Sequence, residues 1–214
     1  MLFEKDRTLA NRNNIIKSWK IILSDYSDGM LETTRKSLSR LNYNFQYEIV
    51  NAENIQLSNN TFDVILANNM LYHIQNRYEA LKNISRILKD NGTFIASTMG
   101  KNDLIELHNY LYQFLENKGY CFTFREFVFS LDNGIEQLSK YFKNITMKKH
   151  DNKLKINGVE AIINYYISFN EIHENMVVLP EKYVNEFREY LTTIIEREKE
   201  IIVTKDEGIF ICKK

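Results

Sequence analysis

TFDVILANNMLYHI, residues 61–74, is the stretch that decides the fold. Its apolar run, residues 62–66, is rich in β-branched side chains, which suits a strand buried on both faces of a parallel sheet. The run ends in Asn68 and Asn69, so polar groups gather at the carboxyl end of the strand, where open α/β sheets bind ligands. On these residues alone, an ordinary strand-helix-strand unit fits equally well.

The segments on either side of this stretch alternate between strand and helix patterns. WKIILSD, residues 19–25, reads as a strand that ends in an acid, and Ser27 or Asp28 then offers a cap for a helix. Helical spacing of apolar residues returns at 78–88 and at 101–118. The alternation predicts a three-layer α/β fold with a mostly parallel sheet. Strands are expected at 19–24, 46–50, 62–67, 93–98, 143–149 and 208–213.

The C-terminal half contains further helix patterns and several turn signals. Helices are expected at 134–142, 159–169 and 180–200, the last one beginning at the single proline, Pro180. Residues 151–155 are polar and precede an Asn157-Gly158 turn, and 201–214 reads as a hairpin-like pair of strands around Asp206-Glu207-Gly208. We therefore expect one domain, 1–214, with about 101–142 and 151–200 as helical insertions or lid elements.

Composition narrows the classes of function. Lys+Arg and Asp+Glu number 28 each, and the resulting net charge of zero argues against a broad nucleic-acid surface. Cys121 and Cys212 lie far apart, which suits buried thiols in a reducing compartment better than a disulfide or metal site. No apolar run approaches the roughly 20 residues of a membrane span, and the first residues do not read as a signal peptide. We expect a soluble cytoplasmic protein without metal or membrane.

Together these segments resemble the class I S-adenosylmethionine-dependent methyltransferases that act on small molecules. The resemblance runs from about Ser18 to the end of the chain. It rests on the segments IILSDYSDGML, IVNAENIQLSNNTFDVILANNMLYHI, ISRILKDNGTFIAST and GIFICKK. It implies a Rossmann-like fold with an antiparallel C-terminal edge strand, so that 143–149 and 208–213 form an antiparallel edge pair. It also implies S-adenosyl-L-methionine as the cofactor and a small-molecule methyl acceptor.

The resemblance assigns cofactor contacts to residues at the ends of two strands. Asp25 would accept hydrogen bonds from both ribose hydroxyls, and Tyr26 would lie against the adenine ring. The family often has Asp-Ala-Glu where this sequence has Asn51, Ala52 and Glu53, so the resemblance assigns all three, Glu53 included, to cofactor binding. The Asn51 amide oxygen would accept the adenine amino group, and the Ala52 N–H would serve a ring nitrogen. Structural alternatives remain open: Asp25 as a helix cap and Asn51 as a plain turn residue.

The resemblance also assigns residues near the transferred methyl group. Asn68 matches the position that lines the methionine portion, and an Asn there is about as often a structural cap. His73 would act as a general base or orient the substrate, with Tyr72 beside it, although a lone His at a helix start is more often structural. Tyr165 and Tyr166 would contact the substrate from a lid, whereas two tyrosines in a helix more often belong to a core.

One element of the family is missing from this sequence. A first strand and a glycine-rich loop should precede residue 19, because only residues without a β-carbon let the backbone pass close to the cofactor. The first glycine is Gly29, and residues 1–18, polar and loosely helical, resemble the helix that follows that loop. The missing strand would lie between 19–24 and 62–67, and its absence leaves two unpaired edges. The fold is thus expected to be N-terminally incomplete.

Three outcomes are compatible with this gap. The chain is a fragment of a longer enzyme, or the two strands pair directly, or a second chain, as in a homo-oligomer, covers the gap. The expected function is methyl transfer from S-adenosylmethionine to an unidentified small molecule by direct displacement. The alternative is a truncated, non-catalytic homologue that serves as a binding or assembly module. In either case we expect these 214 residues alone to bind the cofactor weakly or not at all.

Overall fold

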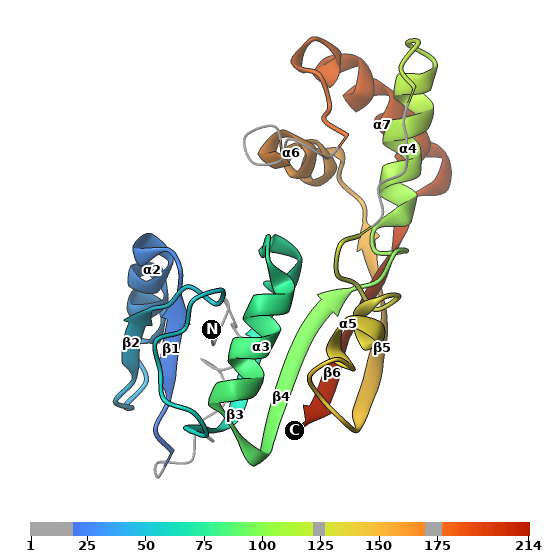
Figure 1. The fold of residues 1–214 in the computed structure, drawn as a ribbon. Coiled ribbons are helices and arrows are strands. Elements are labelled where there is room, and N and C mark those ends of the chain that lie inside the picture. Colours follow the sequence, from blue (N-terminus) through green and yellow to red (C-terminus); the bar gives the residue numbers. More distant parts are fainter. Residues whose placement is uncertain (1–18, 122–126, 170–176) are drawn as a thin grey trace. The chain divides into compact units, whose positions relative to one another are not determined.

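The computed structural model describes residues 19–121, 127–169 and 177–214 (Figure 1). The helices and strands, in chain order, are β1 (Ile22–Asp25), α2 (Asp28–Leu38), β2 (Gln46–Ile49), β3 (Phe62–Asn68), η1 (Leu71–His73), α3 (Arg77–Ile87), β4 (Leu88–Met99), α4 (Ile105–Glu116), α5 (Gly134–Leu138), β5 (Ile145–Ile156), α6 (Val159–Phe169), η2 (Glu181–Tyr183), α7 (Val184–Glu198) and β6 (Ile201–Lys213).

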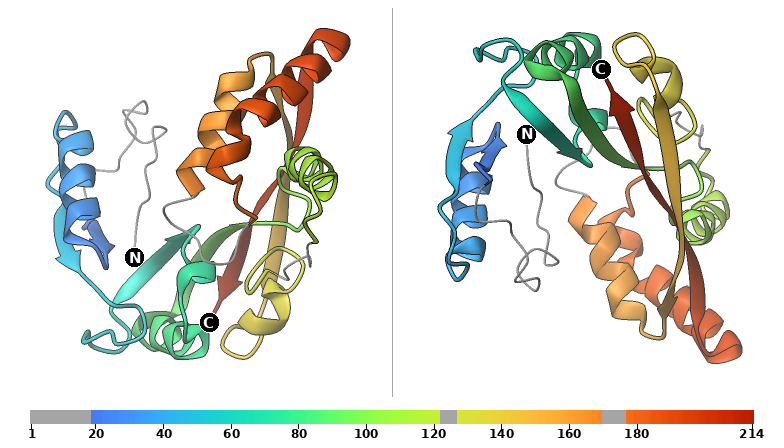
Figure 2. Two further views of the ribbon diagram at one scale, coloured as in Figure 1. Left: turned by 90° about the horizontal axis from the view of Figure 1, so that it is seen from above. Right: turned by 90° about the horizontal axis from the view of Figure 1, so that it is seen from below.

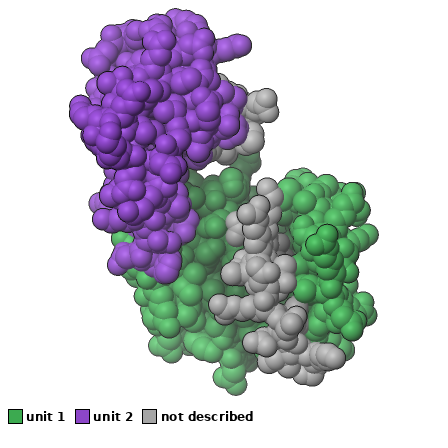
Figure 3. Space-filling view, turned by 180° about the vertical axis from the view of Figure 1, so that it is seen from behind, with its two compact units in different colours: residues 1–99, 128–149, 208–214 green, residues 100–127, 150–207 purple. Residues whose placement is uncertain are grey.

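The described residues group into two compact units, which Figure 3 colours separately. Unit 1 contains the chain up to Met99 together with Val128–Lys149 and Gly208–Lys214. Unit 2 contains Gly100–Phe127 and His150–Glu207. Residues 128–149, which the sequence suggested dividing between an insertion and a strand, thus group with the sheet of unit 1.

Unit 1 contains the strands that the sequence predicted. β1 pairs with β2 in parallel, and the other strands form a sheet of order β3-β4-β6-β5 in which β3 and β4 are parallel. In Figure 1 the arrow of β6 runs opposite to that of β4, so the expected antiparallel strand is present. β6 and β5 form the last pair at this edge, with β5 outermost. The α/β class and the mostly parallel sheet are confirmed.

No pairing joins the two sheets of unit 1 among the residues that the structure describes. Within the described part of the chain, β1 pairs only with β2 and β3 only with β4, so the outcome in which strands 19–24 and 62–67 pair directly is wrong. A small apolar pocket of about 20 Å³ lies beside these unpaired edges. Its lining comes from β1, β2, β3 and the loop between β2 and β3: Ile22, Ser24, Glu48, Val50, Leu57, Phe62 and Ile65.

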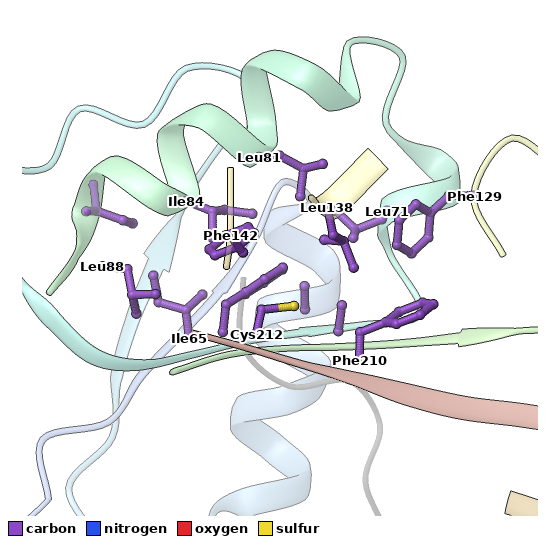
Figure 4. Packing of buried hydrophobic residues seen from close by; sticks show 14 of the residues in the cluster. Ile65, Leu71, Leu81, Ile84, Leu88, Phe129, Leu138, Phe142, Phe210 and Cys212 are labelled. Carbon is purple, nitrogen blue, oxygen red and sulfur yellow. The ribbon is translucent and has the colours of Figure 1, made fainter. Parts of the chain in front are cut away.

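The core of unit 1 lies between α3, α5 and the sheet (Figure 4). The N-cap of α3 is Asn76, whose side chain accepts the N–H of Glu79 (3.3 Å). Its apolar residues at three- and four-residue spacing are buried. The helix contacts β4, and the two views of Figure 2 show α3 beside this sheet. The fully buried side chains of this core include Ile65, Leu71, Leu81, Ile84, Leu88, Phe94, Phe129, Leu138, Phe210 and Cys212. Burying them supplies the main stabilisation of the sheet that carries β3.

Unit 2 has a separate core formed by α4, α6, α7 and the first half of β6. The leucine spacing that predicted helix 101–118 gives α4, and Leu107, Leu111 and Leu115 are all buried. Ile162 and Ile163 of α6 and Phe187 and Leu191 of α7 complete this core. Each unit therefore has its own hydrophobic core.

One prediction about the C-terminal strands is wrong, and one strand is longer than predicted. The hairpin around Asp206-Glu207-Gly208 does not form, because β6 continues through these residues. Gly208 is needed for close packing, since a β-carbon there would lie 2.7 Å from the Lys148 carbonyl oxygen. The polar residues 151–155 belong to β5, whose side chains are exposed on both faces, so no alternating pattern marks them as a strand.

β4 also begins earlier than expected, at Leu88. Leu88 lies opposite Phe62, whereas Thr93 lies opposite Val64, so the strand is irregular between these two pairs. Predictions on residues 1–18 fall outside the described residues. None of the described helices is long and apolar enough to cross a membrane.

Candidate functional site

Asp25 is the last residue of β1 and begins the candidate site. Its Oδ1 accepts the N–H of Ser27 (2.8 Å), and its carbonyl oxygen accepts the N–H of Val50 (3.0 Å). The cap of α2 is Ser27, whose hydroxyl accepts the N–H of Met30 (3.3 Å), so Asp25 is not the capping residue itself. Among the described residues, its second oxygen, Oδ2, makes no hydrogen bond, which leaves it available to a ligand.

Asn51, Ala52 and Glu53 lie beside Asp25, because β1 and β2 pair in parallel and Asp25 is opposite Ile49. Asn51 Oδ1 accepts the N–H of Glu53 (2.9 Å) and forms a tight turn. An amide oxygen has two lone pairs, so this turn leaves one for an adenine amino group. Ala52 is buried. The turn geometry fits both the structural and the ligand-binding interpretation of Asn51.

Tyr26 follows Asp25 and is 76% exposed. An exposed aromatic ring next to the proposed ribose contact is available for stacking on a base. At the other end of the candidate site, Asn68 is the half-buried last residue of β3, opposite Ser97 of β4. The next residue, Asn69, has a positive φ of 44°, and its N–H donates to the carbonyl (3.1 Å) and hydroxyl (3.0 Å) oxygens of Ser97. Ser97 therefore holds the sharp turn that follows Asn68.

Tyr72 and His73 lie in the short 3-10 helix η1, after this turn. Their ring centroids are 4.4 Å apart, with Tyr72 half-buried and His73 exposed. An exposed imidazole can exchange protons with solvent and with a bound molecule. Asn68, Tyr72 and His73 thus occupy one continuous segment of unit 1.

Tyr165 and Tyr166 lie in α6 of unit 2, so they are not in the unit that contains the other predicted residues. Tyr166 is 2% exposed and packs edge-on against Phe187, with ring centroids 5.8 Å apart. Tyr165 is half-buried, and its ring contacts Tyr166 at 5.2 Å. Burial raises the pKa of both phenols, so both keep their protons. This environment favours the core interpretation of Tyr166.

Sequence reasoning missed three residues that fix the loop between β2 and β3. Arg86, in the last turn of α3, donates to the carbonyl oxygens of Ile55 and Leu57, both at 2.6 Å. Asn83 Nδ2 donates to the Glu53 carbonyl oxygen (3.0 Å), and the Glu53 carboxylate accepts the N–H of Asn76 (3.1 Å). The only sign of these hydrogen bonds in the sequence is a row of polar residues on α3, and such a row is usually interpreted as a solvent-exposed face. Within the described residues, no group of three or more His, Cys, Asp or Glu side chains could hold a metal ion.

Comparison with known proteins connects this geometry to a family. Residues 7–96 match the methyltransferase domain family. Curated relatives include the ubiquinone/menaquinone biosynthesis C-methyltransferase UbiE of Hydrogenovibrio crunogenus, 30% identical over 98 residues, and that of Blochmanniella pennsylvanica, 31% identical over 109 residues. The matches cover 45% and 48% of this chain, and 39% and 43% of the relatives. The chain thus spans less than half the length of the curated relatives that it matches.

Solved structures show the same fold at low sequence identity. The MccD protein is 16% identical with a TM-score of 0.51, covering 90% of this chain and 79% of its own. A protein from Bacillus halodurans C-125 assigned as a methyltransferase is 12% identical with a TM-score of 0.52, covering 91% and 81%. The [4+2]-cyclase SpnF is 11% identical with a TM-score of 0.50, covering 91% and 66%. Residues 7–96 are thus similar to a methyltransferase domain, and the chain shares the fold of these solved structures.

Proposed function

We propose that the protein binds S-adenosylmethionine at the carboxyl ends of β1, β2 and β3 and transfers its methyl group to a small-molecule acceptor. The observation that carries this proposal is the carboxylate of Asp25. One oxygen is oriented by the Ser27 N–H, and the other makes no hydrogen bond within the described part of the chain. Two carboxylate oxygens fixed at the end of a parallel strand fit the two adjacent hydroxyls of a ribose.

The neighbouring residues fit the rest of the cofactor. Asn51 would orient the adenine through its amide oxygen, and the exposed ring of Tyr26 would cover one face of the base. Asn68 would contact the methionine portion from the end of β3. When bound, S-adenosylmethionine supplies an electrophilic methyl group on a positively charged sulfur. The residues of the chain contribute mainly by positioning, because the attacking atom must lie in line with the methyl carbon and the sulfur.

His73 is the residue in this segment suited to proton transfer. Its exposed imidazole, beside Tyr72, would accept the proton of an acceptor whose hydroxyl or carbon must lose one. An acceptor that attacks through a nitrogen lone pair needs no base in the bond-forming step. Replacing His73 by Ala therefore separates these two acceptor classes once an acceptor is known.

Titration with S-adenosylhomocysteine tests the proposal. We expect weak binding by the 214 residues, with a Kd of about 1 mM, followed in ¹⁵N–¹H spectra. The Asp25→Ala variant should bind at least about tenfold more weakly, because each charge-assisted hydrogen bond contributes about 1.5–3 kcal/mol. The melting temperature without ligand should stay the same.

Asp28→Ala is the matched control, since Asp28 is also acidic, lies three residues away in the first turn of α2 and is exposed. It should keep the affinity of the wild type. Wild-type protein that shows no shifts at saturating ligand would refute the proposal, and equal affinity of the Asp25 and Asp28 variants would refute the ribose assignment. A ligand test is needed because a [4+2]-cyclase shares this fold, and fold alone does not establish activity.

A further inference from the structure

Glu53 connects the two ends of the candidate site. Its backbone N–H donates to Asn51 Oδ1 (2.9 Å), within the turn proposed to contact adenine. Its side-chain Oε1 accepts the N–H of Asn76 (3.1 Å), which follows Tyr72 and His73 after two residues. One residue therefore contacts the adenine turn through its backbone and the segment near the methyl group through its side chain.

The place where Glu53 binds is the amino terminus of α3. Asn76 is the N-cap of this helix, and its own side chain accepts the N–H of Glu79 (3.3 Å). A carboxylate is stabilised there by the helix dipole and by the free N–H groups of the first turn. The Glu53 carboxylate thus binds the amino terminus of α3 within the protein, so a ligand is not needed to explain its charge.

The rest of α3 holds the same loop along its length. Asn83 Nδ2 donates to the Glu53 carbonyl oxygen (3.0 Å), about two turns along the helix from Asn76. Arg86 donates to the carbonyl oxygens of Ile55 and Leu57 at 2.6 Å, and to Asn59 Oδ1 at 2.9 Å. The loop that follows Asn51 is therefore fixed to α3, and it cannot shift without breaking these hydrogen bonds.

We infer that Glu53 is a positioning residue that sets the spacing between the turn at Asn51 and the segment carrying Tyr72 and His73, and that it does not contact the cofactor. This inference rests on the proposed function and changes the role that the family resemblance gave to Glu53. A ligand that spans both ends needs the spacing, whereas one that occupies only the adenine end does not. The side chain should therefore matter more for S-adenosylhomocysteine than for adenosine.

The test compares Glu53→Ala and Glu53→Gln with wild-type protein. The first readout is hydrogen exchange at the Asn76 amide without ligand, which should become several-fold faster in Glu53→Ala. Glutamine keeps an oxygen acceptor, so Glu53→Gln should restore slow exchange. The second readout is affinity. Glu53→Ala should weaken S-adenosylhomocysteine binding about tenfold, the effect of losing about 1.4 kcal/mol, and leave adenosine binding within about twofold of wild type.

Glu79→Ala is the control, because it removes an acid from the same helix end without touching the loop. Glu79 pairs with Lys82 (3.2 Å), and its variant should leave both affinities unchanged. Equal losses for adenosine and S-adenosylhomocysteine in Glu53→Ala, or unchanged exchange at Asn76, would overturn the inference. Wild-type protein that binds neither ligand would overturn the proposed function instead, while exchange at Asn76 would still decide whether the Glu53 link exists.

Discussion

His108, in α4 of unit 2, is a single residue whose protonation should affect stability. Burial lowers the pKa of its imidazole below the usual value of about 6.5, and the nearby Asp103 carboxylate opposes this shift only in part. Its ring stacks on Tyr112, with centroids 6.3 Å apart. The unfolded chain therefore takes up a proton at His108 at a higher pH than the folded chain does. Stability should fall as pH decreases from about 6.5 toward the folded pKa.

Replacing His108 by Gln should remove part of this acid sensitivity. We expect the melting temperature of His108→Gln to fall less than that of wild type between pH 7.5 and 5, followed by circular dichroism. The largest contribution of one such group is about 1.4 kcal/mol per pH unit. His150→Gln is the control, because His150 is exposed on β5 and its variant should follow the wild-type curve. Parallel curves for all three proteins would contradict the prediction.

At the scale of elements, one ion pair ties β6 to the segment between β4 and α4. Lys205 Nζ lies 2.9 Å from Asp103 Oδ1, and the two side chains are 17% and 6% exposed. Asp103 also accepts the N–H of Asp206 (3.0 Å). Burial raises the pKa of Asp103 even though Lys205 opposes the shift, so its charge depends on these partners.

Removing Lys205 should therefore destabilise the protein strongly. Lys205→Met leaves the Asp103 carboxylate buried without its cation, and breaking a buried pair costs about 3–5 kcal/mol. Lys155, which pairs with Glu200 at 2.9 Å, is 69% exposed, and Lys155→Met should cost less than about 1 kcal/mol. Urea unfolding of both variants measures the difference. A similar small cost for both would show that water screens the Lys205 pair.

The elements that the sequence predicted well are those with one buried face. The leucines of α4 and the apolar stripe of α3 alternate with polar residues at helical spacing, so their burial is encoded locally. β5 is exposed on both faces and has no such pattern. In the sequence, Gly208 looks like a turn residue. The structure shows that a glycine is needed there because the backbone of Lys148, on another strand, comes close to it, and the spacing of residues along the chain cannot reveal this contact.

The same limit applies to the candidate site. Asp25 ends β1 and Asn51 follows β2, and the two strands pair in parallel, so the predicted strand order alone brings these residues together. The hydrogen bond from Asn76 to Glu53 joins residues 23 positions apart through a loop of irregular shape. Arg86 likewise reaches carbonyl oxygens that carry no sequence signature. Contacts to backbone atoms across loops therefore could not be predicted from the sequence and were found only in the structure.

At the scale of the whole molecule, the unjoined edge of β3 gives a prediction for hydrogen exchange. Asn69 donates its N–H group to the carbonyl oxygen of Ser97 in β4, at 3.1 Å. Because a strand alternates with period two, the N–H of Ala67 also points to β4 and that of Leu66 points to the opposite side. If the gap is open in solution, the Leu66 amide should exchange at least about tenfold faster than that of Ala67, a difference of about 1.4 kcal/mol in protection.

Ala67 serves as the internal control, since it is fully buried and adjacent in the same strand. Native-state exchange followed by NMR at several denaturant concentrations would separate local from global opening. Equal protection of the two amides would mean that another segment, from this chain or a second copy, covers the edge of β3. A second copy would be recognised because protection would then depend on protein concentration.

The discontinuous composition of unit 1 has a consequence for its synthesis. Its core combines Ile65 and Phe94 from the first hundred residues with Phe210 and Cys212 from β6, all at most 1% exposed. While the ribosome translates the intervening helices, β4 lacks its β6 neighbour and one of its edges is unpaired. Nascent chains expose such surfaces to chaperones and to aggregation. The core of unit 1 can therefore be completed only after β6 has been translated, and a chain that stops before Phe210 would lack part of this core.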